Sequence, residues 1–290
     1  MKESEIIIVK NIPDEIYHKI ALDAVKYAII SIPFTIDRIG LRNRNRQIFN
    51  IAKGKLAEGL FKFFCKENNI EANFNICETP FYQIDKRDFI LDDSEWDQKN
   101  NFIYHSADQL ISLQYTDLPA LVPNRANRKD QWQKRKEHYF KNSKSVKFLF
   151  TFMKAADKNN RRSNFFAINL SGKQLEFLDK LYSKYKGLPL KEKPFGINDF
   201  WEEMTYLKDD HISFQLHEKS NLVITAYADS NQWDLFFDTE GKNFLDGTLW
   251  TKIRNKTCHL NKLPSFLSLF PQLGERMKFG FIAPCRKRQS

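Results

Sequence analysis

Apolar residues recur at three- and four-residue spacings in two early stretches of the chain, at residues 13–30 and 45–67. Because an α-helix has 3.6 residues per turn, these spacings place the apolar side chains on one face of each stretch. Pro33 follows the first stretch, and a helix does not readily continue through proline. We therefore predict two amphipathic helices, of which the second is the longer.

After residue 69 the pattern changes to the alternation of apolar and polar residues that is typical of β-strands. Four strand segments are expected around an acidic turn, at residues 72–76, 81–84, 88–91 and 95–99. Side chains of an extended chain alternate between its two sides, so Glu95, Asp97 and Lys99 are expected on one face. A carboxylate and an amine two residues apart can therefore point into the same site.

The middle of the chain predicts a helix, two strands and a second helix capped by Ser171, at residues 127–141, 146–153, 165–170 and 171–185. Residues 186–196 carry both proline and glycine and are the best candidate for a domain boundary. Beyond them, four further strand-like segments indicate a β-rich region, at residues 212–216, 221–227, 233–237 and 248–257.

Length and composition predict a folded, soluble protein. The chain has 290 residues, of which 42% are hydrophobic, enough to bury a full core. It has no apolar run of about 18 residues and no N-terminal signal-peptide pattern, so we expect a cytoplasmic location and no membrane association. Its four cysteines are scattered, which favours reduced thiols over a zinc or iron–sulfur site.

Net charge favours a polyanionic partner. The 46 Lys and Arg residues outnumber the 36 Asp and Glu residues, giving a formal charge of +10. The basic residues gather in runs, of which each alone is usually a solvated face, at residues 42–55, 125–136 and 286–288. The sequence has no phosphate-binding P-loop, no dinucleotide fingerprint and no Gly-x-Ser-x-Gly elbow, which lowers the nucleotide-dependent and acyl-transfer alternatives.

Three acids and a lysine suggest a particular chemistry. Glu58 falls on the second predicted helix, Asp88 on a strand, and Asp97 and Lys99 on the next strand. Two or three carboxylates can bind Mg²⁺, which lowers the pKa of a bound water, and a nearby lysine can position that water or stabilise charge. This set suits phosphodiester hydrolysis. The alternative for Glu58 is a solvated glutamate paired with a neighbouring lysine such as Lys55.

This arrangement resembles the PD-(D/E)xK superfamily of restriction-endonuclease-like nucleases, over roughly residues 44–186. Asp88 matches the aspartate of the PD motif, with Arg87 in place of the proline, and Asp97 and Lys99 match the (D/E)xK pair. The resemblance implies that Asp88 and Asp97 are catalytic metal ligands, that Lys99 is catalytic, and that Glu58 is an additional ligand. Other acids compete for these roles, namely Asp85, Asp92, Asp93, Glu95 and Asp108.

The resemblance implies an α/β (α+β) fold with a restriction-endonuclease-like core, whose mixed central sheet is flanked by helices, and a C-terminal β-rich subdomain. We divide the chain into an N-terminal helical segment, a nuclease core and a β-rich region that suits DNA recognition, at residues 1–43, 44–190 and 191–290. The alternative for the last region is a structural extension of the sheet.

The implied function is a Mg²⁺-dependent endonuclease acting on double-stranded DNA, most like a prokaryotic type II restriction enzyme. Mn²⁺ can substitute in such enzymes. The resemblance also implies a homodimer and a DNA methyltransferase encoded nearby. The alternatives are a non-catalytic basic nucleic-acid-binding protein and a repair or defence nuclease of the same fold.

Polar and basic side chains that follow the predicted strands of residues 72–99 are candidates for DNA contacts, because Gln and Arg reach base edges and phosphates. The candidates are Arg125, Arg128, Gln131, Lys134 and Arg135, with Lys252 and Arg254 near the C-terminus. The alternative for the first group is an exposed basic helix with Trp132 packed inward.

Overall fold

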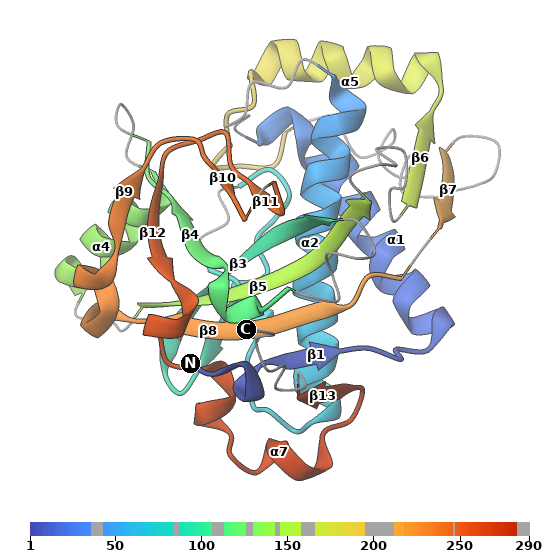
Figure 1. Ribbon diagram of the computed structural model, residues 1–290. Helices are drawn as coiled ribbons and strands as arrows, with labels where there is room; N and C mark the ends of the chain where they lie inside the picture. Colours follow the sequence, from blue (N-terminus) through green and yellow to red (C-terminus); the bar gives the residue numbers. More distant parts are fainter. Residues whose placement is uncertain are drawn as a thin grey trace.

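Six strands form the central sheet of the protein, in the order β13-β1-β8-β5-β3-β2 (Figure 1). Their bounds are Gly280–Ile282 for β13, Ile7–Val9 for β1, Leu222–Ala228 for β8, Val146–Asp157 for β5, Ser94–His105 for β3 and Phe89–Leu91 for β2. The computed structural model describes residues 1–35, 43–83, 87–105, 113–125, 130–142, 146–157, 166–194, 212–217, 219–245 and 247–282.

The central sheet is mixed. β3 runs parallel to β5, whereas the other neighbouring strands pair in antiparallel fashion. Three smaller sheets flank it: β4 (Pro119–Pro123), β12 (Asn255–His259) and β9 (Phe237–Thr239) form one; β6 (Phe166–Leu170) and β7 (Ile212–Leu216) form the second; β10 (Asn243–Phe244) and β11 (Leu249–Trp250) form the third. The expected α/β class with a mixed sheet and helices is confirmed.

Five α-helices lie among the described residues: α1 (Asp14–Ser31), α2 (Arg44–Glu67), α4 (Gln131–Asn142), α5 (Gly172–Tyr185) and α7 (Leu273–Arg276). Short 3₁₀ helices occupy Glu3–Glu5, Ile32–Phe34, Asn75–Cys77, Tyr115–Asp117, Ser230–Leu235, Leu260–Lys262 and Phe266–Leu269. The predicted helices at residues 13–30, 45–67 and 171–185 are confirmed. Ser171 caps α5 as expected, because its hydroxyl accepts a hydrogen bond from the N–H of Gln174.

The sheet separates two hydrophobic cores. On one face α1 and α2 cover the strands, and Phe61 of α2 packs against Phe89 of β2 with ring centres 5.1 Å apart. On the other face Trp132 of α4 stacks on Phe148 of β5 at 5.9 Å. Alternate residues of β3 therefore face different surroundings, and Trp96 stacks on Phe89 in the α2 core. This alternation places Asp97, the next residue, on the α4 side.

Two predicted strands are wrong for local reasons. Residues 75–77 form a 3₁₀ helix, because the Asn73 side chain accepts hydrogen bonds from the N–H groups of Asn75 and Ile76. Residues 230–235 also form a 3₁₀ helix, where Asp229 accepts from the N–H of Asn231. In both places a short polar side chain satisfies backbone donors that a strand would have offered to its neighbour.

Other segments differ in extent from the expectation. Residues 81–83 form a turn, and residues 248–257 divide into β11 and the beginning of β12. The central sheet takes strands from all three predicted parts of the chain: β1 from residues 1–43, β2, β3 and β5 from residues 44–190, and β8 and β13 from residues 191–290.

No helix in the described part of the chain combines the length and the apolar character needed to cross a bilayer.

We expect Phe61→Ala to lower the free energy of unfolding by about 3–5 kcal/mol, because the ring is fully buried between Phe74, Phe89 and Phe266. Urea denaturation followed by circular dichroism measures this change. Phe237→Ala is the matched control, since that ring is 47% exposed. Equal losses in the two variants would contradict the central place of Phe61 in this core.

Candidate active site

The β2–β3 hairpin carries the residues that the sequence singled out. Its turn uses Asp92 and Asp93 at φ of 48° and 54°, a left-handed conformation that aspartate tolerates better than most residues. The tight turn fixes the register, so that Phe89 lies opposite Trp96 and Ile90 opposite Glu95. This register brings the residue before β2 next to the middle of β3.

Asp88 forms hydrogen bonds to β3 on both sides of Asp97. The main-chain N–H of Asp88 donates to the carbonyl of Trp96 at 2.9 Å, and its carboxylate accepts a hydrogen bond from the N–H of Gln98 at 2.5 Å. These two bonds bracket Asp97. The structure therefore brings Asp88 and Asp97 together, although they are nine positions apart in the chain.

One face of β3 presents Glu95, Asp97 and Lys99 in a row. The Lys99 ammonium donates to Oδ1 of Asp97, and both side chains are at most about one-tenth exposed. The buried carboxylate of Glu95 pairs with Arg87 and lies 3.2 Å from Nε2 of His138. Each acid of the row is thus matched to a basic group.

Helix α4 supplies the basic groups that cover this row. Nε of Arg135 donates to Oδ2 of Asp97 at 3.0 Å, and His138 contacts Glu95. Arg135 and His138 lie about one turn apart on α4, so both can face β3 and each contacts one acid of the row. Trp132 anchors the helix against Phe148.

Arg135 is near all three carboxylates. Burial alone would lower its pKa, but Asp97 raises it, with further contributions from Asp88 and Glu95. We call the set Asp88, Glu95, Asp97, Lys99 and Arg135 the acidic cluster, since it forms around these three acids. It lies at the contact between β3 and α4.

The charge of Asp97 depends on its two cationic partners. Burial would raise the pKa of this carboxyl, yet Lys99 and Arg135 lower it to about 2. Asp97 is therefore ionised at any pH above about 3. Both oxygens of this carboxylate are occupied, so a divalent cation would have to displace Lys99 or Arg135 to reach it.

The donor set was tested for metal coordination. No three or more His, Cys, Asp or Glu side chains in the described part of the chain form a group that could hold a metal ion. The oxygen donors of Asp88 and Asp97 nevertheless fit Mg²⁺, which is usually bound by one or two carboxylates together with waters and substrate phosphates. Asp88 and Asp97 are thus the residues that would hold such an ion.

Helix α2 carries Glu58 on the other face of the sheet. Oε2 of Glu58 accepts a hydrogen bond from Lys55 at 2.6 Å, the pairing that the alternative interpretation expected. Lys53, from the same basic run, is only 6% exposed. Its ammonium lies 4.7 Å from the ring centre of Phe49 and 4.2 Å from that of Phe102, and burial, aided by Arg46, lowers its pKa to about 8.

The competing acids fall in different places. Glu95 belongs to the acidic cluster, whereas Asp92 and Asp93 are exposed in the hairpin turn. Asp85 and Asp108 lie outside the described residues. The three described cysteines are buried and unpaired, and burial raises the pKa of each thiol, which makes them poor nucleophiles.

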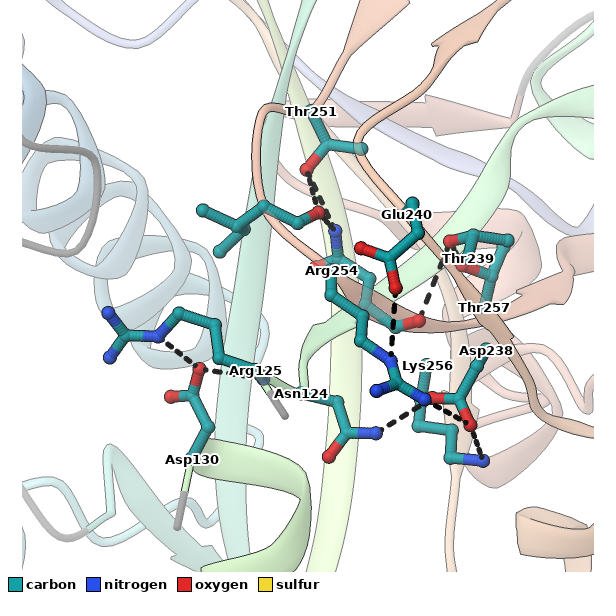
Figure 2. Close-up of polar contacts among 12 residues, drawn as sticks. Asn124, Arg125, Asp130, Asp238, Thr239, Glu240, Thr251, Arg254, Lys256 and Thr257 are labelled. Carbon is teal, nitrogen blue, oxygen red and sulfur yellow. Dashed lines mark hydrogen bonds and ion pairs between the residues drawn. The ribbon is translucent and has the colours of Figure 1, made fainter. Parts of the chain in front are cut away.

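A second set of ion pairs lies on the small β4–β12–β9 sheet (Figure 2). Asp238 of β9 lies at its centre, with Lys256 at 3.0 Å, Arg254 at 3.2 Å and the amide nitrogen of Asn124 at 2.8 Å. Arg254 also lies 3.6 Å from Glu240. Burial would raise the pKa of Asp238, but these partners lower it.

The predicted DNA-contact residues are thus divided among several places. Arg125 pairs with Asp130 at 2.9 Å, Arg135 binds Asp97 in the acidic cluster, and Arg254 belongs to the second set of ion pairs. Lys134 and Lys252 are exposed, and Gln131 begins α4 half-buried. Arg128 lies outside the described residues.

Family models, curated proteins and solved structures were compared with the chain. None of them matches.

Sequence reasoning missed the contact of His138 with Glu95 and the part of Asn124 and Lys256 in the second set. The spacing of Arg135 and His138 placed both on one side of a predicted helix, but it did not show which acids that side would meet. Nothing local pointed to Asn124, because its partner Asp238 is 114 residues away.

We expect Asp97 to make stability depend on pH between about 4 and 2. Its pKa is lower in the folded protein than the ordinary value of 3.8, so its stabilisation is complete above pH 4 and is lost as the pH falls towards 2. The expected loss is about 2 kcal/mol. Urea denaturation at a series of pH values measures it.

Asp97→Asn should lack this component, whereas Asp92→Asn, in the exposed turn, should keep it. Asparagine also tolerates the left-handed conformation at position 92. Identical pH profiles for wild type and Asp97→Asn would contradict the assignment.

Proposed function

We propose that the chain is a Mg²⁺-dependent endonuclease that hydrolyses phosphodiester bonds of double-stranded DNA, with a restriction-endonuclease-like core. One observation carries the proposal. Asp88 forms hydrogen bonds to β3 on both sides of Asp97, and Lys99 donates a hydrogen bond to the carboxylate of Asp97. A largely buried lysine beside two acids, one on β3 and one immediately before β2, is a side-chain set that can promote such hydrolysis.

The order and direction of the elements support the same core. α2, the β2–β3 hairpin, β4, α4 and β5 follow one another, with β4 in a separate sheet, and β5 lies parallel to β3. Parallel neighbours require a crossover connection, and here α4 lies within that crossover and covers the acidic cluster. The position of Asp88, Asp97 and Lys99 beside this crossover helix supports the proposed core.

Each residue would have a separate task. Asp88 and Asp97 would hold the ion, which when bound polarises a phosphoryl oxygen and acidifies a coordinated water. Lys99 is fixed by Asp97 and would orient the attacking water or hold a phosphate oxygen by hydrogen bonding. Arg135 keeps Asp97 ionised, and it would turn towards the phosphate when the ion takes its place. The proposed role of Glu58 at a second ion, from the opposite face, stays a prediction.

The surrounding charge supports an anionic substrate. The chain carries a formal charge of +10. Lys134 and Lys252 are exposed, so they contribute to a positive electrostatic potential at the surface that attracts an anionic substrate. We propose a type II restriction enzyme for which Mn²⁺ can replace Mg²⁺, in a prokaryotic cytoplasm. A DNA methyltransferase gene next to the coding gene would support restriction, and its absence would favour a repair or defence nuclease.

We expect wild-type protein with Mg²⁺ to nick supercoiled plasmid DNA, and Lys99→Ala and Asp88→Ala to lower the rate about 100-fold or more. The reason is the loss of a transition-state charge or a metal ligand. Lys66→Ala, an exposed lysine at the end of α2, is the control with the same charge change and should cleave normally. Gel electrophoresis of the plasmid forms measures the rate.

Circular dichroism of each variant separates loss of activity from loss of folding. Binding of DNA without nicking in either Mg²⁺ or Mn²⁺ would favour the alternative, a non-catalytic basic nucleic-acid-binding protein. In that case the acidic cluster would serve only as a buried ion network.

We also expect a homodimer, because enzymes that cut both strands of a duplex usually work as homodimers with one site for each strand. Sedimentation velocity at micromolar protein, with and without a duplex oligonucleotide, should give a mass near twice the 34.4 kDa of one chain. A monomer under both conditions would contradict this part of the proposal.

A further inference from the structure

An open pocket of about 400 Å³ lies on the other side of α4 from the acidic cluster. Its walls include two aromatic rings, Trp132 and Phe140, and two lysines, Lys136 and Lys256. Asn124, which follows β4, also lines it beside the second set of ion pairs (Figure 2), and the remaining lining residues are Gln133 and Glu137 of α4. We call this space the α4 pocket.

The phase of α4 explains why one helix borders two sites. Successive residues are rotated by 100°, so Trp132, Lys136 and Phe140, spaced four apart, form one stripe, while Arg135 lies to the other side. Trp132 points inward between them onto Phe148. The pocket and the acidic cluster are therefore separated by about the width of a helix, roughly 10–12 Å.

Phe140 presents an exposed aromatic ring on which a ligand ring could stack. Its side chain is 68% exposed, and its ring lies edge-on to Tyr139 at 5.4 Å and to Trp233 at 6.2 Å. Exposed aromatic rings beside lysines are the usual platform for unpaired nucleic-acid bases. Lys136 is also exposed and lies one turn from Phe140 along the same stripe.

Asn124 adds an oriented acceptor. Its amide nitrogen donates to Asp238 at 2.8 Å, and Figure 2 shows this nitrogen turned to Asp238 with the oxygen turned away. That oxygen, Oδ1, is buried and has no hydrogen-bond partner among the described residues. A buried acceptor without a donor is costly, so an N–H group from a ligand would stabilise it.

We propose that the α4 pocket binds one unpaired base of the DNA strand. The base stacks on Phe140, the adjacent phosphate contacts Lys136, and an exocyclic amine reaches Asn124. This inference rests on the proposed function for the nature of the ligand. It adds a site for base recognition near the position of cleavage, at a distance of a few nucleotides along the strand.

The test uses fluorescence anisotropy with a labelled single-stranded oligonucleotide in EDTA, where no cleavage occurs. Phe140→Ala should weaken binding about tenfold, because stacking contributes strongly to such complexes. Phe237→Ala removes a partly exposed ring of β9, outside the pocket, and should bind as wild type. An oligonucleotide of abasic residues keeps the phosphates, so wild type and Phe140→Ala should bind it equally weakly.

Two results would overturn the proposal: unchanged affinity of Phe140→Ala for the base-bearing strand, or equal affinity of wild type for the abasic strand. Because Phe140 is exposed, its variant should fold, and circular dichroism verifies this. Base-dependent binding without plasmid nicking would support base binding in the α4 pocket and contradict the proposed nuclease activity. Plasmid nicking by the wild type, together with unchanged oligonucleotide binding by Phe140→Ala, would support the nuclease activity and contradict base binding in the pocket.

Discussion

The candidate site depends on the two ion pairs formed by the buried carboxylate of Asp97. Lys99 holds one oxygen and Arg135 the other, and all three side chains are largely withdrawn from water. Removing Asp97 would leave two buried cations without the carboxylate they share, and breaking a buried ion pair in this way typically costs about 3–5 kcal/mol. The same pairing joins β3 to α4 and keeps the acid ionised, so the stability of this contact and its proposed chemistry have one origin.

The alternation of β3 makes this site compatible with a hydrophobic interior. Trp96 points into the core under α2, and Asp97 and Lys99 point to the α4 side, where Trp132 and Phe148 form a separate apolar cluster. Charged groups are therefore gathered at a seam between a strand and one helix. The opposite face of the strand is free to bury aromatic rings.

Helix α4 connects the two proposed sites. One side contributes Arg135 to the acidic cluster, and the other contributes Lys136 and Phe140 to the α4 pocket. A strand of DNA lying across this helix could place a phosphate at the acids while an unpaired base enters the pocket. Cleavage and base recognition would then share a rigid element instead of a loop, which keeps their spacing fixed.

Local patterns determined the long helices, the cap at Ser171, and the shared face of Asp97 and Lys99, because helix and strand periodicity are properties of neighbouring residues. Such patterns failed at Asn73 and Asp229, where one polar side chain redirected the backbone. Only the tertiary structure decided that Asp88 brackets Asp97, that Arg135 binds an acid, and that Asn124 meets Asp238. Those contacts depend on the register of the strands and on the packing of helices against them. Because residues far apart in the chain determine the register and the packing, local patterns could not predict these contacts.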